Sequence, residues 1–81
     1  MQVRVGLHGW YRTGVDGADG LLEVTVPVGS DVLAVAESLR EQAPMLDGRA
    51  SLVMIDGRKV ELDLVLEEGQ EVHYYPIFSG G

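Results

Sequence analysis

The chain has 81 residues, of which 46% are hydrophobic, so it is long enough for one compact domain and too apolar for a disordered tail. Thirteen acidic and six basic residues give a net charge of −7, which argues against binding a nucleic-acid backbone and favours a partner with a basic docking surface. The absence of cysteine excludes a disulfide, a thiolate nucleophile and a cysteine metal site.

The first residues alternate polar and apolar side chains and do not have the apolar run of a signal peptide. No apolar segment approaches the roughly 20 residues that a membrane-spanning helix needs. The sequence therefore predicts a cytoplasmic protein that contacts neither a membrane nor a nucleic acid.

The first part of the chain predicts a β-hairpin. Residues 2–7 alternate with a period of two, and residues 22–26 do so again before Pro27 and Gly29. Between them, residues 13–20 hold three glycines and two aspartates, a composition typical of a loop. Two short alternating segments joined by such a loop indicate antiparallel strands.

A helix is predicted next, beginning after Ser30 and ending before Pro44. Ser30 is the expected N-cap, because its hydroxyl can accept a bond from a free backbone N–H, and Asp31 suits the positive end of the helix dipole. The apolar residues at helical spacing are Val32, Val35, Ala36, Leu39 and Ala43.

Three further strands are predicted at residues 51–55, 58–62 and 72–77. Asp56-Gly57 joins the first two as a two-residue hairpin turn, since both positions tolerate positive φ. Residues 67–70 form a second, acidic turn. The element order β-β-α-β-β-β gives an α+β fold in which one main helix covers one face of a mixed sheet of about five strands.

If the first and last strands pair in parallel at the centre, this fold is the ubiquitin-like β-grasp. We expect a β-grasp domain at residues 1–77 and a flexible Gly-Gly tail at residues 78–81. The predicted core consists of Val3, Val5, Leu7, Val24, Val26, Val32, Val35, Ala36, Leu39, Val53, Ile55, Leu62, Leu66 and Val72.

The stretch from Met54 to Gly81 resembles the C-terminal half of the MoaD/ThiS-type sulfur carrier proteins. That family shows a hairpin turn, a leucine-containing segment, an acidic-Gly-x-Glu-Val motif, an aromatic-proline strand and a terminal Gly-Gly. The corresponding segments here are Asp56-Gly57, Leu62–Leu66, Glu68–Val72, Tyr75-Pro76 and Gly80-Gly81. The chain departs from the family at Ile77, where a second proline is frequent, and at Phe78, where a small aliphatic residue is usual.

The resemblance implies that the working group is the C-terminal carboxylate of Gly81, and that the chain is a carrier or small subunit rather than an enzyme. An E1-like adenylating (activating) enzyme would join this carboxylate to AMP, using ATP and Mg. Sulfur from a cysteine desulfurase or a rhodanese would then convert it to a thiocarboxylate. Phe78, Ser79 and Gly80 would contact the partners, and the chain itself would bind no cofactor and no metal.

Several functions stay open within this interpretation. The glycine-rich first loop and the Ser-Gly-Gly ending favour the MoaD side, with a molybdopterin synthase large subunit as the sulfur-accepting synthase. A carrier for thiamine or another sulfur-containing metabolite is the alternative within sulfur transfer. A ubiquitin-like modifier would instead join Gly81 to a lysine amine of a target, and a non-covalent binding module would not use the terminus at all.

The remaining polar and aromatic residues have simpler interpretations. His8 and His73 are read as surface strand positions, and Glu67, Glu68 and Glu71 as a solvated acidic turn rather than a calcium site. Tyr74 and Tyr75 must point to opposite faces of the last strand, so one packs in the core and the other faces outward. Trp10 and Tyr11 are expected to cover the loop that follows the first strand.

Overall fold

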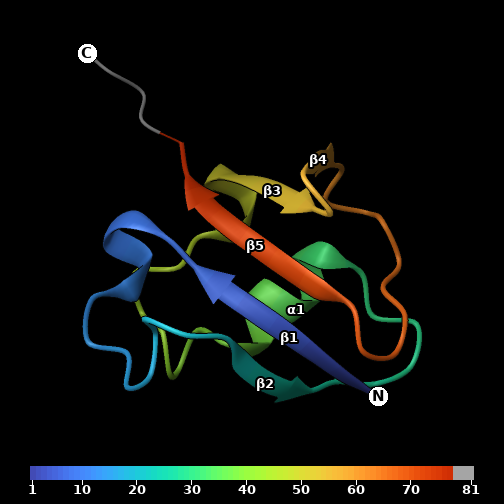
Figure 1. Ribbon diagram of the computed structural model, residues 1–81, viewed down its shortest axis with the longest axis horizontal. Coiled ribbons are helices and arrows are strands. Elements are labelled where there is room, and N and C mark those ends of the chain that lie inside the picture. The colour runs from blue at the N-terminus through green and yellow to red at the C-terminus, as the bar shows by residue number, and fades with distance from the viewer. Residues whose placement is uncertain (78–81) are drawn as a thin grey trace.

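The computed structural model describes residues 1–77 and shows a five-stranded mixed sheet (Figure 1). The strands are β1 (Gln2–Leu7), β2 (Leu22–Thr25), β3 (Ser51–Ile55), β4 (Arg58–Val60) and β5 (Glu71–Pro76). Their order across the sheet is β2-β1-β5-β3-β4, and β1 and β5 pair in parallel. The predicted β-grasp arrangement is confirmed. The tail predicted at residues 78–81 lies outside the described residues.

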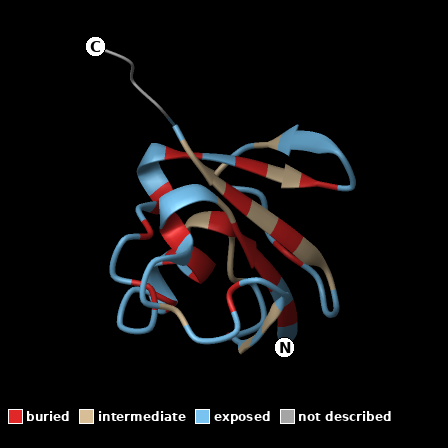
Figure 2. Ribbon diagram, turned by 60° about the vertical axis from the view of Figure 1, so that its left-hand side comes forward, coloured by how far each residue is buried: buried red, intermediate tan, exposed pale blue. Residues whose placement is uncertain are grey.

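One helix, α1 (Val32–Ser38), packs on one face of this sheet, and the core lies between them (Figure 2). Alternation along the strands turns Val3, Val5 and Val72 into this layer. All predicted core residues are buried except Val24 and Leu62, which are partly buried at its margin. The core also contains five buried residues that the prediction omitted: Tyr11, Ala18, Ala43, Leu46 and Tyr74.

The predicted N-cap of the helix is wrong by one residue. Asp31 is the N-cap, and its Oδ1 accepts a hydrogen bond from the Ala34 N–H at 2.8 Å. The Ser30 hydroxyl instead donates to the Pro27 carbonyl at 2.7 Å and closes the preceding turn. Both side chains can cap a helix, so sequence alone did not separate them.

The helix also ends earlier than predicted, at Ser38. The Leu39 N–H donates to both the Ala36 and Glu37 carbonyls, which tightens the last turn. The chain then continues in turns to Ala43, whose N–H donates to the Leu39 carbonyl at 2.8 Å. Leu39 and Ala43 therefore remain on the buried side although they lie outside the helix.

Strand β4 stops at Val60 because the chain after it turns toward the helix. The Leu62 and Leu64 carbonyls accept hydrogen bonds from the Leu33 and Val32 N–H groups at 2.9 and 3.0 Å. These N–H groups are in the first turn of α1 and have no partner within the helix. Residues 61–66 thus satisfy the start of the helix instead of extending the sheet.

A short 3₁₀ helix, η1 (Gly9–Arg12), follows β1 and brings Tyr11 into the core, where it is 2% exposed. Its hydroxyl lies 2.9 and 3.1 Å from the Asp47 and Ala50 carbonyls and 2.8 Å from Ser51 Oγ. These partners lie at the two ends of a second 3₁₀ turn, η2 (Gly48–Ala50), directly before β3. Tyr11 therefore links the end of β1 to the start of β3, a larger role than covering a loop.

Replacing Tyr11 with phenylalanine is expected to lower the free energy of unfolding by about 1–3 kcal/mol, because the hydrogen bonds of its hydroxyl are lost and the buried Ser51 hydroxyl loses this partner. Urea denaturation of the wild type and the variant measures this difference. Tyr75→Phe is the matched control, since Tyr75 is half-buried on the other side of the sheet. A Tyr11→Phe effect no larger than that of the control would contradict the linking role.

Candidate functional site

The segment that leads to the C-terminus is β5, the central strand of the sheet (Figure 1). It pairs with β1 on one side and β3 on the other, and the Ile77 N–H donates to the Ala50 carbonyl at 3.1 Å just past its end. The chain is therefore fixed in position up to its last described residue. The predicted site residues Phe78, Ser79, Gly80 and Gly81 all lie outside the described residues.

Tyr74 ties this strand to the helix beneath it. Its side chain is fully buried, and its hydroxyl donates to the Val32 carbonyl at 2.6 Å. Burial, with the nearby Asp31 carboxylate as a second cause, raises the pKa of the Tyr74 hydroxyl far above its usual range, so the group stays a neutral donor. The prediction that one tyrosine of this pair packs inward is confirmed, and Tyr75 lies on the opposite face.

The sheet face turned away from α1, called here the open face, carries apolar side chains near the end of β5. Tyr75 pairs with Leu52 in the register of β5 and β3, and Ile77 follows with 53% of its surface exposed. Beside them, a groove of about 560 Å³ is lined by Leu52, Val60, Leu62, Pro76 and Ile77, with Lys59 among its polar residues. This apolar surface adjoins Ile77, the last described residue.

Trp10 lies on η1, which packs against the same end of β5. A Cβ atom on Gly9 would lie 2.9 Å from Pro76 Cγ, so glycine permits this close approach. Trp10 is 44% exposed. Sequence alone did not indicate this approach, because Gly9 and Pro76 are 67 residues apart in the chain.

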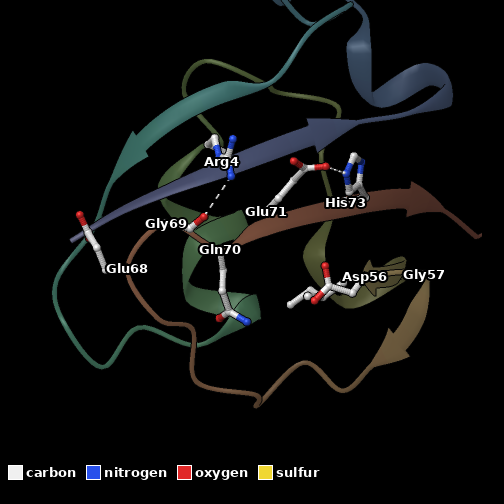
Figure 3. Close-up of a pocket in the computed structure, with 9 residues that line it drawn as sticks. Arg4, Asp56, Gly57, Glu68, Gly69, Gln70, Glu71 and His73 are labelled. Carbon is white, nitrogen blue, oxygen red and sulfur yellow. Dashed lines mark hydrogen bonds and ion pairs between the residues drawn. The ribbon is translucent and has the colours of Figure 1, made fainter.

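The acidic turn is at the other end of β5. Residues 67–70 precede Glu71, where the strand begins, whereas Ile77 follows its last residue (Figure 1). Within this turn, Glu68 accepts a hydrogen bond from the Gln2 N–H, and the Gly69 carbonyl accepts one from Arg4 at 3.4 Å (Figure 3). Glu67 and Glu68 therefore lie well away from the C-terminal end of β5. The Glu71 side chain, on the strand itself, contacts another residue of β5.

That residue is His73, which was predicted to be a surface residue of the last strand. Glu71 Oε2 lies 2.6 Å from His73 Nε2 (Figure 3), and His73 Nδ1 lies 2.9 Å from His8 Nε2. The three side chains thus form a connected chain on the open face. Within residues 1–77, no three or more histidine and acidic side chains are arranged to hold a metal ion. No helix in that range is both long and apolar enough to span a bilayer.

The central parallel strand pair, the flanking antiparallel strands and the single covering helix define a ubiquitin-like β-grasp domain. No protein-family model matches the chain. No curated protein matches it either. The similarity of this chain to known proteins is therefore found by comparing its fold with solved structures.

Among solved structures, SAMP1 from Haloferax volcanii matches with a TM-score of 0.75 and 19% identity, with complete coverage of both chains. A putative molybdopterin converting factor, subunit 1 from Pyrococcus furiosus matches with a TM-score of 0.74 and 22% identity, covering 94% of this chain and 97% of the other. A ubiquitin-like protein from Caldiarchaeum subterraneum matches over 99% of this chain and all of the other, with a TM-score of 0.53 and 17% identity. The MoaD/ThiS-like β-grasp fold predicted from sequence is confirmed by these neighbours.

Proposed function

We propose that this chain is a sulfur carrier that works through the C-terminal carboxylate of Gly81. The observation that carries the proposal is the Gly80-Gly81 ending, placed four residues after the aromatic-proline end of a central β-grasp strand. The fold neighbours support it, because one is described as a molybdopterin converting factor subunit and another as SAMP1. In this proposal the chain acts with partner enzymes and is not an enzyme itself.

The chemistry needs activation because a carboxylate is a poor electrophile. One oxygen of the Gly81 carboxylate attacks the α-phosphorus of ATP on an E1-like activating enzyme, and pyrophosphate leaves. The terminal sulfur of a persulfide on a desulfurase or rhodanese then attacks the acyl carbon, and AMP departs with that oxygen. A second thiol cleaves the resulting acyl disulfide, which releases the thiocarboxylate and leaves a protein disulfide.

Glycine suits both final positions because it has no Cβ, so the backbone can pass through a narrow channel to the nucleotide. All acid–base and phosphate chemistry belongs to the partners in this scheme, with ATP and Mg bound by the activating enzyme. The sulfur is then donated in molybdopterin biosynthesis, to a synthase large subunit that binds the end of β5. The glycine-rich first loop, the Ser-Gly-Gly ending and the similarity to the molybdopterin converting factor subunit support this last step.

Incubated with an activating enzyme, ATP, Mg and a sulfur donor, the untagged chain is expected to gain the mass of one sulfur minus one oxygen. Intact-mass spectrometry measures the gain, and fragmentation assigns it to Gly81. Omitting ATP is the control, since no thiocarboxylate should then form. Absence of the gain with every activating enzyme of this type tested would contradict sulfur carriage.

A ubiquitin-like modifier is the second candidate, and the observation in its favour is the structural match to a small archaeal modifier protein over 93% of this chain. The same acyl adenylate would then be attacked by a lysine amine of a target, forming an isopeptide. Chains linked through this protein's own side chains could use only Lys59, its single lysine. Conjugates of higher mass, seen by peptide mapping of a reaction without sulfur donor, would identify this function.

A further inference from the structure

The three connected side chains of the open face have a defined proton arrangement at neutral pH. The Glu71 carboxylate can only accept, so His73 Nε2–H donates to it across 2.6 Å. In a neutral ring, His73 Nδ1 is then the acceptor, and His8 Nε2–H donates to it across 2.9 Å. Each nitrogen of His73 is therefore engaged, by Glu71 (Figure 3) and by His8, and the carboxylate determines the tautomers of both rings.

The backbone is shaped to allow this contact. Gly6 pairs with His73 in the parallel register of β1 and β5. A Cβ atom at Gly6 would lie only 2.3 Å from His73 Nδ1, so any larger residue would displace the ring from its place over β1. His8 is held from the other side by Tyr75, with ring centroids 4.1 Å apart and planes tilted by 11°.

We propose that Glu71, His73 and His8 form a proton-operated switch on the open face. With one proton in the gap between the rings, the switch is closed. When both rings carry two protons, two N–H groups face each other where one hydrogen bond was, and the rings must separate. The open form adds positive charge beside Tyr75 and releases His8 from its stack.

The consequence for partners rests on the proposed function. Tyr75 pairs with Leu52 and lies two residues before Ile77, on the apolar surface at the end of β5. A partner enzyme that acts on Gly81 must approach this surface. The protonation state of His8 and His73 would therefore determine the charge of the surface to which the partner binds. The switch therefore regulates docking, and the carboxyl chemistry itself is unaffected.

Charged groups on all neighbouring elements act on the two rings. The groups that face them are Glu71 and Tyr75 on β5, Arg4 on β1, Arg12 on η1, Asp19 in the following loop and Lys59 on β4. Burial, then His73 and Arg12, lower the pKa of His8 below its usual range. The folded protein therefore favours neutral His8 more than the unfolded chain does. The contribution of His8 to the free energy of unfolding is complete above its unfolded pKa of about 6.5, and it is lost as the pH falls through its lower pKa in the folded protein.

The test is a pH titration of the ring nitrogens by ¹⁵N-correlated NMR on the free, full-length chain. At neutral pH we expect His73 and His8 both as Nε2–H tautomers, with exchange-protected ring N–H signals. Gly6→Ala should remove those signals and shift the His8 pKa upward toward 6.5. Gly20→Ala is the matched control, because a Cβ atom at Gly20 has no neighbour closer than 3.9 Å. This variant should leave the ring N–H signals and the His8 pKa unchanged.

Glu71→Ala provides a second test that does not alter the β1 backbone, and it should remove the tautomer preference of His73. A His8 pKa at the ordinary value in the wild type, or tautomers unchanged in Glu71→Ala, would overturn the switch. Neither measurement uses ATP, a partner or Gly81. A failed switch and a failed sulfur-carrier assay are therefore distinguishable.

Discussion

Deletion of Gly81 is expected to abolish thiocarboxylation while changing the free energy of unfolding by less than about 0.5 kcal/mol. The shortened chain still ends in a glycine carboxylate, at Gly80, so the chemical group is retained. Its position changes by roughly 3.3–3.6 Å, the reach of one residue. Reacting atoms must approach to about 3–3.5 Å, so a carboxylate that is one residue short cannot reach the α-phosphate.

The fold should tolerate the deletion because the buried core is built from residues between Val3 and Tyr74. Intact-mass spectrometry measures the sulfur gain, and thermal unfolding measures the stability of the same samples. Gly81→Ala is the informative companion, because it keeps the length of the chain and adds only a Cβ. We expect it to react more slowly than wild type. A truncated chain that still gained sulfur at Gly80 would contradict the requirement for a carboxylate at the position of Gly81.

The fold was predictable because each element is specified locally. Alternation in residues 2–7 located β1, and Asp56-Gly57 located the β3–β4 turn, where φ is +52° and +76°. The errors fall where two neighbouring residues could fill the same role, or where a distant segment binds the backbone. Asp31 replaces Ser30 as the cap, and β4 ends at Val60 because the carbonyls that follow it bind the start of the helix.

The C-terminal site stays a prediction from sequence, whereas the imidazole contact was not predicted. The Gly80-Gly81 ending and the Tyr75-Pro76 motif are contiguous, so the sequence displays them directly. The imidazole contact joins His8 to His73 across 65 residues, and the register that brings them together depends on the parallel pairing of β1 with β5. Gly6 was the available signal, since a glycine inside a strand indicates a close approach by another group.

Stability of the domain should depend strongly on Leu39, a buried side chain just after the helix. Leu39→Ala is expected to lower the free energy of unfolding by about 2–5 kcal/mol, through lost transfer free energy and the cavity left behind. Leu39 is 1% exposed and is among the largest fully buried side chains. Small domains commonly have only about 5–15 kcal/mol in total, so this single change removes a large fraction.

Urea denaturation at 25 °C measures the loss, and Leu64→Ala is the matched control, because Leu64 is 39% exposed. The control should lose less than about 1 kcal/mol, since little apolar surface leaves the core. The slope of free energy against urea should stay the same in both variants, which shows that the same surface is exposed on unfolding. An equal loss in the free energy of unfolding for the two variants would contradict the buried position of Leu39. At a temperature where Leu39→Ala remains folded, it should still accept sulfur at Gly81, because its side chain supports the sheet and takes no part in the chemistry.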